Sequence, residues 1–430
     1  MNIRHYLSSI AAVAATAMLS AAPVLAQEAA TTSSAASTAA NEWPAYIEPL
    51  LPLGERLTAK MTGADDPQLR AELYKLVFSQ ISSGYFALLY ADPKHPDFWP
   101  IFNEAYNLFG PNTDNSYSLT PIDGDGVYKI SGFRGTVKIV DLSVSGGTFL
   151  PYGSGDFGKV YGDYDLDTLH IKKDGSFEVI LSNERPKGYK GDWWKLDTKA
   201  NYILVRQLSL DWLHENDARL AIDRLDQPSI KPRPTAQELD AKMRQIPVWA
   251  ENWTSINFRW LQNYLKHTPV NSVYVHSLSS QGGLSTQEYI EGQFEIAPDE
   301  ALIYETEVPK TCRYWGVQVM DMLMVAIDWM NRQSSLNAHS ARIDKDGKFR
   351  AVLAGSDPGV PNWLDTAGYR KGGIIGRWTE CSSNPTPTIT KVKLADVRKH
   401  LPADTPVVTA EARDASLRLR RKGAQLRRRW

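Results

Sequence analysis

The sequence lacks the motifs that identify several common enzyme classes. It has no HExxH and no pair of histidines at zinc-ligand spacing, and its eight histidines are scattered. No glycine-rich phosphate loop and no GxSxG nucleophile elbow occurs. These absences argue against a zinc hydrolase, a nucleotide-cofactor enzyme and an α/β-hydrolase. We therefore expect neither a metal nor an organic cofactor.

Excess charge and long apolar runs are also lacking. The 48 basic and 49 acidic side chains leave a net charge of −1, which argues against nucleic acid as a partner. Beyond the N-terminus no apolar run reaches the roughly 20 residues that cross a bilayer. We therefore expect a soluble mature protein. Its oligomeric state does not follow from the sequence.

The N-terminus has the three parts of a secretory signal. Arg4 and His5 precede an apolar stretch, and Val24 and Ala26 are small residues at positions −3 and −1 before Gln27. We predict a signal peptide over residues 1–26, a flexible leader over 27–40, and a periplasmic or secreted protein.

Cysteine is scarce, with only Cys312 and Cys381. In an exported protein a pair of cysteines permits a disulfide. Both lie in the C-terminal half, which favours a bridge, and two buried thiols are the alternative.

The texture of the chain predicts a mainly β fold with helices. Residues 41–109 read as helical, since Asp66 can cap a helix that begins at Pro67 and continues with apolar residues at helical spacing. Short runs rich in β-branched and aromatic residues, such as GTVKIVDLSV and NYILVRQLSL, predict an antiparallel β-sandwich over 110–226. A linker with helices follows over 227–270, then a second β-sandwich over 271–394 and a basic tail over 395–430.

The two halves share a pattern. KKDGSFEVILS from Lys172 is followed by GDWWKLDT, and DKDGKFRAVLAG from Asp344 is followed by VPNWLDT. Recurrence of the same turn, strand and Trp-Leu-Asp-Thr motifs in the same order indicates a duplication. We therefore predict two related, jelly-roll-like sandwich units with helices packed around them.

The tail from Leu417, LRLRRKGAQLRRRW, is densely basic. One interpretation is a solvated terminal helix. The other is contact with an anionic envelope surface, because clustered arginines near such a surface contribute roughly 1 kcal/mol each.

Part of the second half resembles a known family. RYWGVQVMD from Arg313, SSLN from Ser334, DKDGKFRAVLAGSDPGVPNWLDT from Asp344 and GRW from Gly376 resemble the bacterial domain-of-unknown-function family 1214. The first half resembles its companion family 1254 more weakly. The resemblance implies jelly-roll-like sandwiches and carries no catalytic residues over to this chain.

The same region holds the richest polar cluster. Its candidate catalytic carboxylates are Asp357 and Asp365. Its candidate substrate-binding residues are Arg313, Tyr314, Asn337, Asn362, Trp363, Arg377 and Trp378. Aromatic rings beside Asp, Asn and Arg are typical of carbohydrate sites, where two carboxylates can divide the acid and base roles. We expect Asp357, Asn362, Asp365 and Arg377 to lie together, with Trp363 or Trp378 facing solvent. In the structural alternative, Asp357 belongs to a turn, Asp365 pairs with Arg377, and Trp363 is core.

A parallel cluster lies in the first half. Asp114 and Asp211 are its candidate catalytic residues, and Asn115 and Arg206 its candidate binding residues. A groove between the two units is where both clusters would meet. Asp163, Asp165 and Asp167 alternate as in a calcium loop, but Thr168 replaces the turn glycine, so we interpret them as an acidic turn.

Three functions fit these observations. The first is an exported carbohydrate-active protein, hydrolase-like or lyase-like, with its site between the two units. The second is a non-catalytic glycan-binding or envelope protein. The third is an enzyme acting on a small apolar molecule such as a terpenoid or steroid. The positions of four carboxylates distinguish these functions. They can share one groove, share one closed pocket or lie apart, and the residues are Asp357, Asp365, Asp211 and Asp114.

Overall fold

The computed structural model describes residues 42–427, with gaps at residue 62 and residues 148–157. The predicted signal peptide and leader lie outside the described residues and stay predictions. No helix in the described part of the chain is long and apolar enough to cross a membrane.

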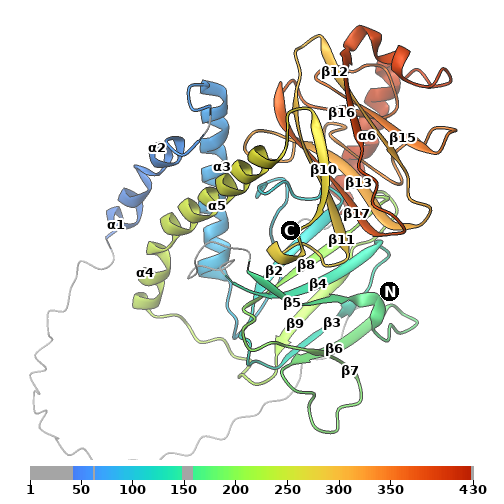
Figure 1. The fold of residues 1–430 in the computed structure, drawn as a ribbon. Coiled ribbons are helices and arrows are strands. Elements are labelled where there is room, and N and C mark those ends of the chain that lie inside the picture. The colour runs from blue at the N-terminus through green and yellow to red at the C-terminus, as the bar shows by residue number, and fades with distance from the viewer. Residues whose placement is uncertain (1–41, 62, 148–157, 428–430) are drawn as a thin grey trace, which may run out of the picture. The chain divides into compact units, whose positions relative to one another are not determined.

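The first half contains two sheets (Figure 1). A five-stranded sheet has the order β1-β2-β8-β4-β5, and a four-stranded sheet has the order β7-β6-β3-β9. All pairings are antiparallel except the parallel β6–β7 pair. The strands are β1 (Trp99–Pro100), β2 (Asn115–Pro121), β3 (Tyr128–Phe133), β4 (Ile139–Gly146), β5 (Lys159–Asp165), β6 (Ser176–Ser182), β7 (Asp192–Lys195), β8 (Tyr202–Leu208) and β9 (Arg219–Arg224).

The second half repeats this topology. Its sheets have the orders β10-β11-β17-β13-β14 and β16-β15-β12-β18, and its one parallel pair is β15–β16. Strands β10 to β18 therefore take the same places in their sheets as β1 to β9, so that β10 corresponds to β1 and β18 to β9. The strands are β10 (Ser272–Ser277), β11 (Gln287–Glu295), β12 (Glu300–Glu307), β13 (Cys312–Met320), β14 (Ser335–Asn337), β15 (Lys348–Ala354), β16 (Trp363–Asp365), β17 (Lys371–Cys381) and β18 (Thr388–Lys393).

The repeated motifs occupy equivalent places in the two halves. Gly175 and Gly347, in the turns before β6 and β15, both have φ of 81°. Glycine adopts this left-handed conformation without the steric cost that a side chain would bring. The mainly β fold with packed helices and its duplication are thus confirmed at the level of topology.

Each pair of sheets encloses an apolar core. The first core includes Val140, Leu142, Val179, Ile203 and Val205. The second includes Trp315, Val317, Phe349, Ile374 and Trp378. Cys312 of β13 and Cys381 of β17 lie opposite each other and form a disulfide, so of the two alternatives left open by the sequence the bridge is the one that occurs.

The helices are α1 (Pro44–Ile47), α2 (Leu53–Thr58), α3 (Pro67–Tyr85), α4 (Ala236–Arg244), α5 (Ile246–His267) and α6 (Ala410–Leu426). A π-helical turn over Phe86–Tyr90 extends α3, and short 3₁₀ turns cover Glu48–Leu50, Leu166–Thr168, Ser279–Gln281 and Leu394–His400. As predicted, Asp66 caps α3, accepting hydrogen bonds from the backbone N–H groups of Gln68 and Leu69. The helical stretch predicted after residue 236 is two helices, because α4 ends at Arg244 and α5 begins two residues later.

Helices α3 and α5 pack against each other beside the sheets (Figure 1). The indole of Trp249 lies against Gly84, where an added Cβ would sit 3.1 Å from its Cδ1 atom. Its Nε1 donates to Ser83 Oγ at 2.9 Å. The aromatic residues of α5 thus form the core of a helical layer.

The basic tail contains α6, which is a terminal helix with mostly exposed residues, as one interpretation expected, but three arginines of the tail are held by the body of the protein. Arg413 donates to Gln333 Oε1 at 2.6 Å and pairs with Asp357 at 2.9 Å. Arg427 pairs with the buried Asp217 at 2.9 Å. The guanidinium of Arg420 lies 4.5 Å from the ring centroid of Trp212. These three arginines therefore fasten the tail to the body of the protein.

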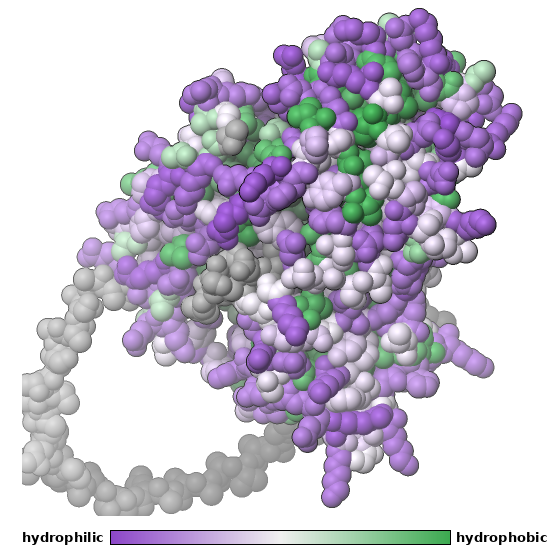
Figure 2. Space-filling view, viewed as in Figure 1, coloured by the Kyte–Doolittle hydropathy of each residue, from purple (hydrophilic) through white to green (hydrophobic). Residues whose placement is uncertain are grey.

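Figure 2 shows one face of the molecule, on which hydrophilic residues are spread over the whole surface. Hydrophobic residues form small patches there, and the larger patches lie over the second unit. This face carries no broad apolar surface, and most apolar side chains of the two units are buried inside the sandwiches.

Candidate functional site

The two five-stranded sheets each present a tyrosine and an arginine at matching positions. Tyr117 of β2 lies opposite Arg206 of β8, and Tyr289 of β11 lies opposite Arg377 of β17. Side chains alternate across a strand, so residues next to core positions face away from the core. Ile203 and Val205 fill the first core, and Arg206 therefore leaves the sandwich. All four side chains line one cavity, to which both units contribute.

This cavity combines a few polar groups with a wide apolar wall. Its volume is about 840 Å³, including space that is open to solvent. The apolar wall includes Phe102, Phe109, Trp260, Leu278, Met324 and Ile375. An apolar pocket with a few convergent polar groups is the usual form of a small-molecule site. We call it the interface cavity.

Three residues of this wall have unusual backbone geometry. Phe102, Phe109 and Met324 have φ values of 52°, 62° and 56°. Left-handed conformations cost free energy for residues other than glycine, and they concentrate at functional sites. Their presence here supports a functional interpretation of the cavity.

The two arginines of the cavity are buried, but among the described residues only Arg206 has a carboxylate near its positive charge. Arg377 donates to Gly110 O at 3.1 Å and lies 5.6 Å from the ring centroid of Tyr289. In the described part of the chain it has no carboxylate within 4.0 Å. Arg206 lies 3.8 Å from Asp141. Burial raises the pKa of Tyr289, while the charges of Arg377 and Arg206 lower it.

A hydroxyl group links Arg206 to two acids. Ser143 Oγ lies 2.9 Å from Asp141 Oδ1 and 2.6 Å from Asp163 Oδ1, and it accepts a hydrogen bond from Arg206 Nη1. A serine has only one hydrogen to donate. All contacts are satisfied when Asp141 is protonated and donates to Ser143, which then donates to Asp163. Burial, followed by the charge of Asp163, raises the pKa of Asp141 to about 7.

A loop of the second unit closes over this group. Leu278 and residues 281–284 line the cavity, and Arg206 Nη2 donates to Gly282 O at 2.8 Å. The N–H of Ser285 donates to Asp163 Oδ2 at 3.1 Å. Arg206, which faces the cavity, and Asp163 together hold the loop in place.

Asp114 joins the two units beside the cavity. Trp212 Nε1 and Asn337 Nδ2 donate to its Oδ1 at 2.9 and 2.8 Å, and the Tyr314 hydroxyl donates to its Oδ2 at 2.8 Å. Burial raises the pKa of Asp114, and its hydrogen bonds with Tyr314 and Asn337 oppose that effect. The structure thus brings together the predicted residues Asp114, Tyr314 and Asn337, with Trp212 as a fourth member.

The predicted second-half site forms only in part: burial and then the nearby charge of Asp357 raise the pKa of Asp365, so these two acids lie close together, but Arg377 is not with them. Asp365 pairs with Arg332 at 2.9 Å rather than with Arg377. Asp357 caps its own turn, accepting from Gly359 N at 2.8 Å, and pairs with Arg413. The predicted Asp365–Arg377 pair is therefore wrong, because Arg377 faces the first unit.

The two tryptophans of that prediction are buried. Trp363 is 7% exposed and donates to Ala354 O, and Trp378 is 2% exposed and donates to Pro385 O. The prediction that one of them faces solvent is wrong. As neighbours on β17, Arg377 and Trp378 must face opposite sides, and Trp378 takes the core side.

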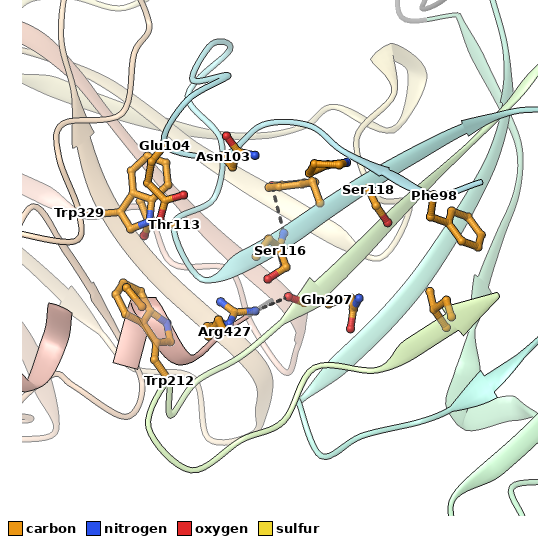
Figure 3. Close-up of a pocket in the computed structure, with 15 residues that line it drawn as sticks. Phe98, Asn103, Glu104, Thr113, Ser116, Ser118, Gln207, Trp212, Trp329 and Arg427 are labelled. Carbon is orange, nitrogen blue, oxygen red and sulfur yellow. Dashed lines mark hydrogen bonds between the residues drawn. The ribbon is translucent and has the colours of Figure 1, made fainter. Parts of the chain in front are cut away.

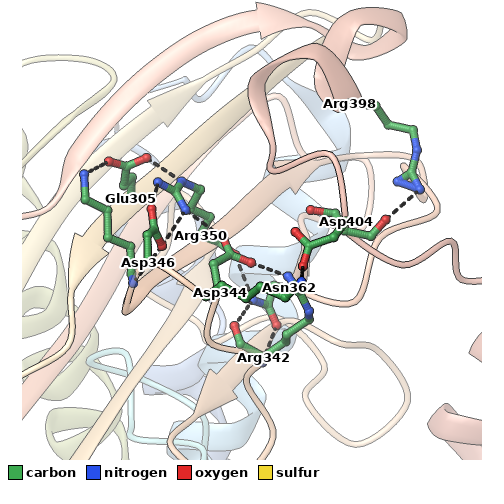
Figure 4. A network of polar contacts seen from close by, with 11 residues as sticks. Glu305, Arg342, Asp344, Asp346, Arg350, Asn362, Arg398 and Asp404 are labelled. Atoms are coloured by element: carbon green, nitrogen blue, oxygen red, sulfur yellow. Dashed lines mark hydrogen bonds and ion pairs between the residues drawn. The ribbon is translucent and has the colours of Figure 1, made fainter.

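Asn362 belongs to a structural network (Figure 4). Its Nδ2 donates to the backbone oxygens of Arg342 and Arg350 at 2.7 and 2.8 Å. Arg350 in turn pairs with Glu305, Asp344 and Asp346. The network fastens β15 to its neighbouring segments.

The remaining candidates lie in three places, and Asp211 lines a further cavity together with Asp114 and Asn337. Asn115 lines the interface cavity, and its Nδ2 donates to the Tyr117 hydroxyl at 3.1 Å. Arg313 pairs with Asp165, Asp167 and Glu380, so the acidic turn is neutralised by arginine. Asp211 lies 2.8 Å from His214. No cluster of three or more metal-ligating side chains occurs in the described ranges.

The sequence interpretation missed Tyr289, Ser143 and Asp141. The repeat held a signal for the first of these, since Asn115-x-Tyr117 and Gln287-x-Tyr289 begin equivalent strands. An alignment of the two halves that extended upstream of the DG turns would have paired the tyrosines.

Fold and site together define a duplicated two-sandwich protein with a cavity between facing sheets. The chain is similar to the crystal structure of an uncharacterized protein from Burkholderia cenocepacia, with 30% identity over 82% of this chain and 97% of that chain and a TM-score of 0.73. The chain belongs to the same family as that protein. The VPA0106 protein from Vibrio parahaemolyticus is 13% identical over 79% of this chain and 100% of that chain, with a TM-score of 0.44. No family model matches the chain, and no curated protein matches it.

Proposed function

We propose that the protein binds a small amphipathic organic anion in the interface cavity. One observation carries the proposal, which is that Arg377 is buried at this cavity without a carboxylate partner in the described part of the chain. A buried charge is costly unless it is paired. An anionic ligand would supply the missing partner.

The surroundings of Arg377 agree with such a ligand. Arg206 adds a second guanidinium, and Tyr117 and Tyr289 add hydroxyl groups that can donate to an anion. Phe102, Phe109 and Trp260 offer an apolar wall to the rest of the molecule. Glu291 also lines the cavity, but it is engaged by Tyr274 and His276 of β10 at 3.0 Å.

The positions of the carboxylates count against the glycoside hydrolase hypothesis. That reaction needs two carboxyl groups facing one sugar. Asp357 and Asp365 pair with arginines of the second half, and the oxygens of Asp114 are occupied by three donors. We therefore favour ligand binding over glycoside hydrolysis. Export and membership of family 1214 stay predictions.

The test compares two probes that differ in charge. We expect naphthalene-2-carboxylate to bind. Neutral 2-naphthalenemethanol should bind at least about tenfold more weakly, measured through tryptophan fluorescence and calorimetry. Arg377→Met and Arg206→Met should each weaken carboxylate binding about 10- to 100-fold, since each removes a charge-assisted hydrogen bond.

Arg350→Met is the matched control, because Arg350 pairs with three acids far from the cavity lining. It should leave the carboxylate affinity unchanged. Equal affinity for both probes, or unchanged affinity in both cavity variants, would refute the proposal.

A further inference from the structure

A second cavity lies where the tail reaches the first unit. It is lined by residues of β2 and β8, by the segment before β2, by Trp212 and Trp329, and by Arg427 after α6. Its volume is about 720 Å³, including space open to solvent. Figure 3 shows Trp212 and Trp329 at one end, Phe98 at the other end and Arg427 between them. We call it the tail cavity.

Four lining residues carry buried polar atoms without a hydrogen-bond partner. The atoms are Asn103 Nδ2, Thr113 Oγ1, Asn115 Oδ1 and Arg427 Nε. The side chains of Asn103, Thr113 and Arg427 are all less than a tenth exposed. Buried polar groups are nearly always paired, so four unpaired groups in one lining indicate a site that water or a ligand completes.

These four atoms include both hydrogen-bond donors and acceptors, which defines the groups that a ligand must offer. Asn103 Nδ2 and Arg427 Nε are donors, Asn115 Oδ1 is an acceptor, and a threonine hydroxyl is both. Hydroxyl groups of a ligand can donate and accept, so they satisfy all four. Ser116 and Ser118 extend the polar lining along β2.

The charge balance separates this cavity from the interface cavity. Arg427 already pairs with Asp217 at 2.9 Å, and both side chains are buried. It also donates to the backbone oxygens of Asp114 and Gln207 at 2.6 and 2.8 Å. Because its charge is neutralised, this arginine does not call for an anion. Glu104 adds a carboxylate to the same lining, which disfavours an anion further, so the ligand class that we consider is neutral.

The aromatic residues fit the same ligand class. Trp212 and Trp329 lie together at one end of the cavity (Figure 3). Both are buried, at 9% and 6% exposed, so they give the cavity an apolar end rather than an open stacking face, and the polar groups beside them can bind hydroxyls. We propose that the tail cavity is a second binding site, for a neutral hydroxyl-rich ligand of the sugar or polyol class.

The test uses the full chain and four separate probes, D-glucose, D-galactose, D-mannose and myo-inositol. Saturation-transfer NMR at up to about 50 mM should detect binding of at least one of them. Thr113→Val should weaken that binding about tenfold, because it replaces the unpaired hydroxyl with a methyl group of similar size.

Thr366→Val is the matched control. The Thr366 hydroxyl is also buried and unpaired, but the residue lines neither the tail cavity nor the interface cavity. It should leave sugar or inositol binding unchanged, and both variants should keep the affinity for naphthalene-2-carboxylate.

If the wild-type protein binds a sugar or inositol probe but does not bind naphthalene-2-carboxylate, the proposed function is rejected and this inference stands.

Two results would overturn the inference. Binding of none of the four probes would mean that ordered water alone completes the cavity. Equal probe affinity in wild type and Thr113→Val would place the bound sugar elsewhere.

Discussion

The guanidinium of Arg206 lies 3.8 Å from the carboxyl group of Asp141, on paired strands β8 and β4. Ser143 bridges the two groups from the wall of the interface cavity. The ionisation of Asp141 therefore sets how much of the positive charge of Arg206 is available to a ligand.

We predict that the affinity for naphthalene-2-carboxylate falls as pH rises through about 7. The pKa of Asp141 is raised to about 7, first by burial and then by Asp163. Below that pH the acid is neutral, and above it a negative charge competes with the ligand for Arg206. The dissociation constant should rise roughly tenfold between pH 6 and pH 8, measured by calorimetry.

Asp141→Asn should flatten this pH profile, because an amide mimics the protonated acid. Asp321→Asn is the control. Burial also raises the pKa of Asp321 to about 7, but its carboxyl group accepts from the backbone N–H groups of Leu323 and Val325 instead of bonding Ser143 beside Arg206. The prediction would be contradicted if Asp321→Asn flattened the pH profile and Asp141→Asn left it unchanged.

We predict that Tyr314→Phe lowers stability without changing ligand affinity. The hydroxyl of Tyr314 donates to Asp114 Oδ2, and both residues are buried. Its removal leaves a buried acceptor with one donor fewer, which should cost about 1–3 kcal/mol of the free energy of unfolding. Denaturant unfolding measures the loss. A stable variant with weakened binding would instead make Asp114 part of the ligand site.

We predict that the tail stabilises the fold through its buried arginines. Arg413→Met should lower the free energy of unfolding by about 1–3 kcal/mol, because Gln333 and Val360 O lose a buried donor. Arg418→Met removes an exposed pair with Asp414 on the same helix and should change stability by less than about 0.5 kcal/mol. Equal effects would mean that α6 contributes no more than a surface helix.

We predict that the disulfide stabilises the second unit. Cys312 and Cys381 are separated by 69 residues, and closing a loop of that length contributes about 2–4 kcal/mol. The double variant Cys312→Ser, Cys381→Ser should unfold at correspondingly lower denaturant concentration. Two free thiols in the unreduced, denatured protein would contradict the bridge.

Local patterns were enough to predict the elements and the duplication. The cap at Asp66, the turns at Gly175 and Gly347 and the alternation in the strands depend on residues close together in sequence. The site depends on more. Whether Arg377 or Trp378 faces the core is a matter of strand register, and a shift of one residue reverses it.

Distant partners explain the other differences. Asp365 pairs with Arg332 instead of Arg377, and Asp357 pairs with Arg413 of the tail. A dense run of arginines resembles a solvated segment until its acceptors are known. The acceptors of Arg413, Arg420 and Arg427 lie 53 to 313 residues away, in segments that the composition of the tail does not indicate.

The equivalence of the two sheets has a consequence for the interface cavity. Each copy of the repeated unit presents one tyrosine and one arginine to the shared cavity. Because both copies belong to one chain, the two sides can differ. Asp141 lies opposite Arg206, whereas the equivalent position opposite Arg377 is Gly316. A Cβ at Gly316 would lie 3.3 Å from Asp114 Oδ2, so the carboxylate of the other repeat approaches the place that a side chain would fill. The asymmetry places an acid with a raised pKa opposite one arginine and no acid opposite the other, a division of roles that a symmetric dimer could not have.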